Sequence, residues 1–214
     1  MPPKRLLRST SFPPDREAVD DSFFDQKLAL FLEAHMDCFE IIASTLLECD
    51  GYWVRRGFKV KLTKEDKKSL KKDCMPRPEI DLLAFKPKDK LIIAFEAKSY
   101  LNSQGVPVKE VMGKTQKGRY KSFTCEPYRK IVLKRLQKDL IDKGMATKTT
   151  KIKLGLIAAR VKGKGADVNK LADHMKKHRW EFWGPSDIKK KLENLKKLDY
   201  ENDVAVIVSK ILNQ

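Results

Sequence analysis

Two apolar runs separated by a short polar break constrain the fold of this chain more than any other feature. Residues 80–85 and 91–95 are rich in β-forming side chains, and the break between them contains Pro87 and Asp89. This pattern predicts an antiparallel hairpin. Because both runs are apolar at nearly every position, we expect the two strands to be covered on both faces, in the middle of a sheet.

Charged residues stand where these two strands end. A turn centred on Lys88 and Asp89 places Asp81 opposite Glu96. Because side chains alternate along a strand, Glu96 and Lys98 share one face, beside Asp81. Charges at the end of apolar strands are costly unless a cation or a substrate pairs with them. The pattern favours a metal site for cutting phosphodiesters; the alternative is that charged strand ends are common in a chain with 35% charged residues.

The net charge of the chain points to a polyanionic partner. The 214 residues include 46 Lys and Arg against 29 Asp and Glu, a formal net charge of +17. These basic residues are spread through globular sequence and do not gather on one amphipathic helix, which favours nucleic acid over a membrane surface. A lysine-rich protein that is merely soluble is the alternative. No apolar run is long enough to cross a membrane.

Cysteine and histidine usage gives no metal motif. No CxxC spacing occurs and no secretory signal opens the chain, so we expect free thiols in a reducing, prokaryotic cytosol or nucleoid. His174 and His178 lie four residues apart on an expected helix, but no cysteine at ligand spacing lies nearby, which favours surface histidines. The cysteines are Cys38, Cys49, Cys74 and Cys125.

The order of expected elements predicts an α/β fold, a mixed central sheet flanked by helices. Strand–helix–strand crossovers follow the hairpin, and a single domain over 22–214 is preceded by a flexible basic arm over 1–21. Residues 64–74 and 102–113 are expected to be connections. The expected helices cover 22–50, 114–143 (one helix, or two broken at Pro127) and 167–179, with Asp167 as its N-cap. From about 186, the C-terminal segment is expected to form one helix to about 198 and a last one from Asp203 to 212. The remaining strands cover 52–62, 153–161 and 180–183.

This order, with Asp81 and Glu96-Ala97-Lys98 in the second and third strands, resembles the PD-(D/E)xK nuclease superfamily. That superfamily includes many restriction endonucleases, Holliday-junction resolvases and RecB-like exonucleases. Its signature acid usually follows a proline directly, whereas two residues separate Pro78 from Asp81 here. The resemblance covers about residues 23–184, and it implies a restriction endonuclease-like fold that acts on DNA.

Three further segments agree with this resemblance. Residues 39–54 look like the first helix and strand of the Mrr-like branch, whose additional acid falls on Glu40; Glu33 and Glu48 on the same expected helix compete for this role. Gln116 and Tyr120 match the QxxxY motif of RecB-like nucleases, and residues 181–184 look like a closing strand. Basic residues around the motif are candidate phosphate contacts; they are Lys114, Lys117, Arg119 and Lys121.

The resemblance also implies a mechanism. Mg²⁺, with Mn²⁺ as a substitute, is expected to bind Asp81, Glu96 and the backbone carbonyl of Ala97, with Glu40 at a second metal or a metal-bound water. Lys98 would position the attacking water, with its pKa held down by the metal if it acts as a base. Gln116 and Tyr120 would orient Lys98 or contact the cut strand. Separately, Lys162 and Lys164 follow a strand in a glycine-rich segment, which is either a phosphate-contacting loop or a solvated one.

Two classes of function follow. The chain is either an Mg²⁺-dependent endodeoxyribonuclease or a DNA-binding module whose chemistry is unused, and the presence of two carboxylates and a lysine favours the enzyme. Among nucleases, a restriction-type (type II) enzyme that cuts double-stranded DNA as a homodimer leads, and a RecB-like or resolvase-like repair nuclease is second. The apolar residues of 192–212 are candidate dimer contacts, although docking onto the same chain explains them equally well.

Overall fold

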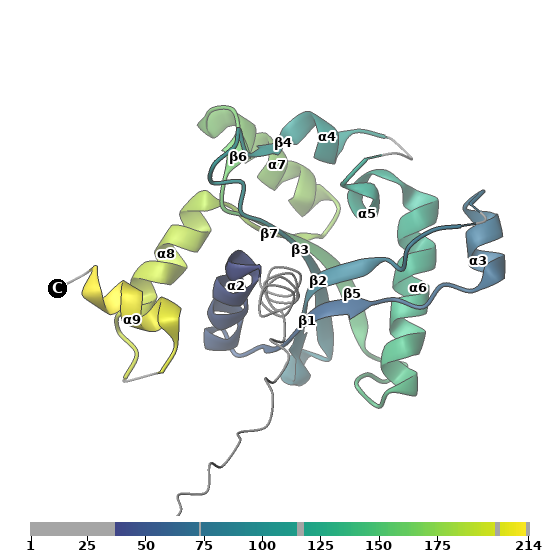
Figure 1. The fold of residues 1–214 in the computed structure, drawn as a ribbon, viewed down its shortest axis with the longest axis horizontal. Coiled ribbons are helices and arrows are strands. Elements are labelled where there is room, and N and C mark those ends of the chain that lie inside the picture. Colours follow the sequence, from purple (N-terminus) through teal and green to yellow (C-terminus); the bar gives the residue numbers. More distant parts are fainter. Residues whose placement is uncertain (1–36, 73, 115–117, 200–201, 213–214) are drawn as a thin grey trace, which may run out of the picture. The chain divides into compact units, whose positions relative to one another are not determined.

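A mixed five-stranded sheet forms the centre of the protein (Figure 1). The computed structural model describes residues 37–72, 74–114, 118–199 and 202–212, all within one unit, Asp37–Gln214. The strand order is β1-β2-β3-β5-β7, with β1, β2 and β3 antiparallel and β3, β5 and β7 parallel. This confirms the α/β class with a mixed sheet. The strands are β1 (Trp53–Lys59), β2 (Glu79–Lys86), β3 (Leu91–Lys98), β5 (Lys151–Ala158) and β7 (Glu181–Trp183).

Helices cover both faces of this sheet, as the sequence predicts (Figure 1). One face packs against α2 (Cys38–Cys49), α8 (Pro185–Leu195) and α9 (Val204–Ile211). The other face packs against α4 (Val108–Met112), α5 (Lys121–Thr124), α6 (Glu126–Asp142) and α7 (Gly165–Lys177). A second, two-stranded sheet joins β4 (Val106–Pro107) to β6 (Val161–Lys162).

The hairpin has the predicted register. Leu82 pairs with Phe95, Leu83 pairs with Ala94, and the 3-10 turn η1 (Pro87–Asp89) joins the strands. Its closing residue, Lys90, adopts the left-handed conformation with φ 48°. Leu82 and Phe95 belong to the core beneath α2, whereas Leu83 and Ala94 belong to the core beneath α6. Both strands are therefore buried on two faces, as their unbroken apolar sequence predicts.

Gly155 allows β5 to lie close to the largest side chain of β3. It pairs with Phe95, and a Cβ atom at this position would lie 2.3 Å from the Phe95 ring. The Phe95 ring in turn packs against Trp183 of β7, with a centroid separation of 5.8 Å. A glycine in this strand is therefore required by packing, since a methyl group would displace the aromatic pair.

Three segments differ from the sequence-based prediction. Residues 64–69 form the short helix α3 (Lys64–Ser69) instead of a loop, because a Thr63–Asp66 capping box starts it and Arg135 of α6 pairs with Asp66. Residues 106–112 form β4 and α4 instead of an irregular segment. The segment 114–143, expected as one helix or as two broken at Pro127, forms two helices, α5 and α6, with Pro127 in the first turn of α6, and residues 118–120 are not helical.

Helix boundaries were otherwise close to the prediction. The sequence predicts that Asp167 caps α7, but Asp167 lies in the first turn of that helix. There its carboxylate accepts a hydrogen bond from the Lys164 N–H (3.2 Å). Asp203 caps α9. The predicted N-terminal arm, the boundary near residue 22 and the first part of the helix expected over 22–50 lie outside the described residues. Among the helices that the structure describes, none is long and apolar enough to cross a membrane.

Candidate active site

Asp81, Glu96 and Lys98 meet at one edge of the sheet. β2 begins and β3 ends at this edge because the two strands are antiparallel, and the register that pairs Leu82 with Phe95 brings Asp81 to Glu96 at the next position. The Lys98 ammonium lies 3.0 Å from Asp81 Oδ2 and 2.9 Å from Glu96 Oε1. The predicted cluster of two carboxylates and a lysine is therefore present in the structure.

The backbone also holds Asp81 in place. The Ala97 N–H donates a hydrogen bond of 2.8 Å to Asp81 Oδ2, the same oxygen that accepts from Lys98. The side chains of Asp81, Glu96 and Lys98 keep only 15%, 21% and 22% of their exposure. A cluster this buried has lost most of its hydration, so each charge depends on the others.

The pKa values show an excess of negative charge in this cluster. Burial and then the Asp81 carboxylate raise the pKa of Glu96. Burial alone lowers the pKa of Lys98, but the carboxylates of Glu96 and Asp81 outweigh it, so the pKa of Lys98 lies above its ordinary value. In the metal-free protein Lys98 is therefore a firmly protonated counter-ion, not a base.

Glu40 contributes a third acid. It lies in the first turn of α2, whose N-terminus is capped by Asp37 through hydrogen bonds to the backbone of Phe39 (2.9 Å) and Glu40 (3.3 Å). Burial, followed by the charge of Asp81, raises the pKa of Glu40 to about 7. Of the competing acids, Glu48 lies at the other end of α2, and Glu33 lies outside the described residues.

The donor set matches a hard divalent cation in chemistry. Carboxylate and carbonyl oxygens are the ligands that Mg²⁺ prefers. Burial, followed by the charge of Asp81, raises the pKa values of Glu40 and Glu96, and a cation would favour the ionised form of both groups. Within the described ranges, no three His, Cys, Asp or Glu side chains are arranged to hold a metal without movement. The Lys98 ammonium occupies the space between Asp81 and Glu96, and it must shift for both to bind one ion.

The residues of the QxxxY match are only partly described. Gln116 and Lys117 lie outside the described residues. Tyr120 is buried at 3% exposure, and its hydroxyl has no hydrogen-bond partner in the part of the chain that the structure describes. Burial, together with the neighbouring Tyr100, raises the pKa of Tyr120. The QxxxY match is expected on a helix. Residues 118–120 are not helical, however, and Tyr120 is the residue directly before α5.

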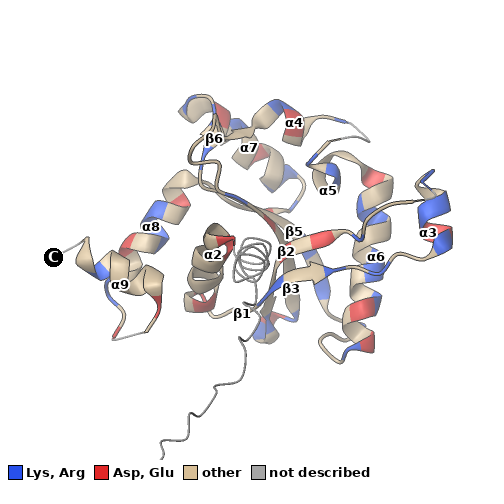
Figure 2. Ribbon diagram, in the orientation of Figure 1, with Lys and Arg blue, Asp and Glu red and all other residues tan. Residues whose placement is uncertain are grey.

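The remaining basic candidates lie on the surface. Lysines and arginines are spread over several helices, not gathered on one (Figure 2). Lys114 is exposed, and Arg119, also exposed, donates a hydrogen bond of 3.3 Å to the Tyr100 hydroxyl. Lys162 and Lys164 are exposed on either side of Gly163, which has φ +113°. The expected glycine-rich loop is therefore a tight turn into α7 that leaves both ammonium groups in solvent.

His174 and His178 form an aromatic cluster with Trp180. Their ring centroids lie 4.6 Å apart, and the His178 ring stacks on Trp180 at 4.4 Å. Burial, with a contribution from His178, lowers the pKa of His174. This packing explains their spacing without a metal ion. Cys38, Cys74 and Cys125 are free thiols, as expected.

Two tyrosines near the site are not predicted by the sequence. Burial, followed by the charge of Glu96, raises the pKa of Tyr128 to about 12, which places this α6 residue within the electrostatic range of the acid cluster. Tyr100 follows Lys98 by two residues, has φ 45°, and lies beside Tyr120. The strand period could have indicated Tyr100; no local signal indicates Tyr128.

Comparisons with protein-family models, with curated proteins and with solved structures found no match. The chemistry of the site therefore rests on its own residues.

Proposed function

We propose that this protein is an Mg²⁺-dependent endodeoxyribonuclease. One observation carries the proposal: two carboxylates and a lysine form a half-buried cluster at the end of two central strands, and the charge of a third acid acts on them. A cluster with this charge is costly to maintain for folding alone. The formal net charge of +17 supports a polyanionic substrate.

Asp81, Glu96, the carbonyl oxygen of Ala97 and Glu40 would hold the metal ion. When bound, Mg²⁺ would supply charge stabilisation at the scissile phosphate and lower the pKa of a water molecule. Lys98, held on the same face by the strand period, would donate to the phosphate and position the attacking water. The Ala97 N–H would keep Asp81 oriented, through the hydrogen bond already present in the metal-free protein.

Restriction-type cleavage of double-stranded DNA by a homodimer is the leading form of this activity. Its support is α9, which buries Val206 against the same chain and yet leaves a second apolar surface exposed. The exposed residues on that side offer a self-complementary contact for a two-fold dimer. They are Val204, Val208, Ile211 and Leu212.

A RecB-like or resolvase-like repair nuclease is the second candidate. The position of Tyr120 favours it, because this tyrosine of the QxxxY match is buried and lies within the electrostatic range of Glu96. A DNA-binding module with unused chemistry is the third candidate, and it predicts binding without cleavage.

Digestion of a supercoiled plasmid with Mg²⁺ tests the proposal. Asp81→Asn and Glu96→Gln are expected to lose cleavage while keeping most of their DNA affinity, because phosphate contacts dominate binding. Glu181→Gln, which removes a carboxylate from β7 of the same sheet, is the matched control and should cut like the wild type. Full activity of Asp81→Asn would exclude this nuclease mechanism.

The products and the oligomeric state separate the candidates. Discrete fragments from a dimer support the restriction-type enzyme. A monomer by light scattering that nicks or resects the plasmid supports the repair nuclease. In a crystal soaked with Mn²⁺, density between Asp81 and Glu96 would support the ligand set, and density only at His174 and His178 would contradict it.

A further inference from the structure

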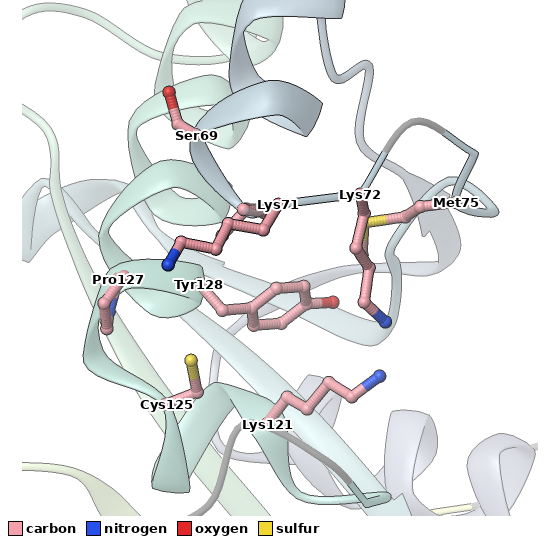
Figure 3. A pocket seen from close by; sticks show the side chains of 9 residues that line it. Ser69, Lys71, Lys72, Met75, Lys121, Cys125, Pro127 and Tyr128 are labelled. Atoms are coloured by element: carbon pink, nitrogen blue, oxygen red, sulfur yellow. The ribbon is translucent and has the colours of Figure 1, made fainter.

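A cavity lined by lysines and one tyrosine lies between the end of α3 and the junction of α5 and α6 (Figure 3). Its volume is about 220 Å³, and its walls come from the end of α3, from Met75 before β2, and from the junction of α5 and α6. In Figure 3 the Tyr128 ring crosses the middle of the cavity, with Lys71 and Lys72 on one side and Lys121 on the other. The cavity thus combines cationic groups with an aromatic surface.

The end of α3 directs two of these lysines to the cavity. Lys71 has φ 54°, a left-handed conformation that normally favours glycine. The Lys71 N–H donates to the Lys68 carbonyl (2.8 Å) and the Lys72 N–H donates to the Lys67 carbonyl (2.9 Å), which is the hydrogen-bond pattern of a Schellman cap. A lysine at the position where glycine fits best gives up some local stability and places an ammonium group at the cavity.

The charges of the cavity lysines are not neutralised within the described chain. None of the three cavity lysines forms an ion pair with any carboxylate that the structure describes; they are Lys71, Lys72 and Lys121. The nearby Glu126 pairs instead with Lys130, at 2.6 Å. Three like charges around one small space repel each other, so an anion there would be stabilised by all three.

Two observations relate the cavity to the candidate active site. Lys121, which lines the cavity, directly follows Tyr120, the buried tyrosine beside Tyr100. The charge of the Glu96 carboxylate acts on the hydroxyl of Tyr128, which crosses the cavity. A group bound against Tyr128 would therefore lie within the electrostatic range of the acid cluster.

We propose that this cavity binds one nucleotide of the strand that is cut, with its phosphate on Lys71, Lys72 and Lys121 and its base against Tyr128. The apolar wall formed by Leu70 and Met75 provides the other surface for a base. A duplex is much wider than the cavity, so only a nucleotide in a single strand, or one that has left the base stack, can enter. This inference rests on the proposed function, and it adds the requirement for an unpaired nucleotide beside the cut.

Binding of the full-length protein to two probes, in EDTA to prevent cleavage, tests the proposal. The probes are a short oligothymidine and a blunt DNA duplex of equal length. Lys72→Ala with Lys121→Ala should weaken oligothymidine binding about tenfold, because two phosphate contacts are lost, and should change duplex binding less than about twofold. The slope of log affinity against log salt should fall by about 0.7 for each lost single-strand phosphate contact.

Four further variants protect this test against changes in folding. Lys71→Gly removes an ammonium group at a position that suits glycine, so it should weaken oligothymidine binding with no loss in melting temperature. Tyr128→Phe should retain affinity and Tyr128→Leu should lose about tenfold, because stacking needs the ring. Lys134→Ala with Lys138→Ala removes two exposed charges from the same helix as Tyr128, outside the cavity, and should bind oligothymidine like the wild type.

Specific results would overturn the proposal. Equal losses on both probes would mean that the lysines contact duplex backbone only, and unchanged oligothymidine binding would mean that the cavity takes no nucleotide. If free dTMP competes as well as the oligonucleotide, the cavity is a mononucleotide site. A wild-type protein that never cuts DNA, but whose oligothymidine binding needs the cavity, would refute the nuclease and leave the cavity proposal standing.

Discussion

Substitution of Glu40 by glutamine should stabilise the metal-free protein at alkaline pH. The pKa of Glu40 is raised from 4.5 to about 7 in the folded protein, by burial and by the charge of Asp81. The folded state therefore disfavours the carboxylate relative to the unfolded chain. This destabilisation is fully present above about pH 7, declines as pH falls towards 4.5, and is absent below that value.

The magnitude follows from the same two pKa values. One pKa unit corresponds to about 1.36 kcal/mol, which sets an upper limit of about 3.4 kcal/mol for the difference between 4.5 and 7. Glu40 is only partly buried, so water screens its charge and the expected gain for Glu40→Gln is about 1 kcal/mol. In a protein of this size that corresponds to a rise in melting temperature of about 2–4 °C.

Thermal unfolding in EDTA between pH 4 and pH 8 measures this effect. The melting curves of Glu40→Gln and the wild type should separate above pH 7 and converge near pH 4.5. Glu48→Gln on the same helix, with its carboxylate exposed, is the matched control and should show no such pH dependence. Added Mg²⁺ should then stabilise the wild type more than Glu40→Gln, because only the wild type keeps the third carboxylate.

Two results would refute this reasoning. If Glu40→Gln melts below the wild type at pH 8, the carboxylate is stabilised by a partner and is not penalised by Asp81. If the gain is the same at pH 4 and pH 8, it comes from packing or helix propensity, and Glu40 does not share the electrostatic environment of the acid cluster.

Three further outcomes are expected. Lys98→Ala should be inactive and should melt below the wild type in EDTA, because Asp81 and Glu96 lose their shared cation. Added Mg²⁺ should raise the melting temperature of Lys98→Ala more than that of the wild type. Gly155→Ala should lose about 1–3 kcal/mol in denaturant unfolding, since its Cβ would lie 2.3 Å from a packed ring; wild-type stability would mean that β3 and β5 can separate without cost. Val208→Lys should convert a dimer into a folded monomer by light scattering, and an unchanged dimer would place the interface away from α9.

The local features of the fold could be predicted because they depend on neighbouring residues. The hairpin register follows from a turn and two apolar runs, and the period of a strand then places Asp81, Glu96 and Lys98 together. The caps follow the same logic less reliably: Asp203 starts α9 as expected, whereas Asp167 acts from inside the first turn of α7. A carboxylate can hold a helix N-terminus from either position.

Other features depend on residues far apart in the chain. α3 has no apolar period that would predict a helix, and it is held by Arg135, 69 residues away from Asp66. Its last turn then brings Lys71 and Lys72 to the same cavity as Tyr128, in a segment that by sequence resembles a solvated lysine-rich loop.

The sequence by itself determined the hairpin, the α/β class and the cluster of two carboxylates and a lysine, because strand alternation and turn chemistry act over a few residues. Only the tertiary structure decided that Glu40, and not Glu48, lies near Asp81, since both belong to one helix and the packing of α2 against the sheet selects between its two ends. The cavity lined by lysines and Tyr128 was decided in the same way, by the packing of α3 against α6.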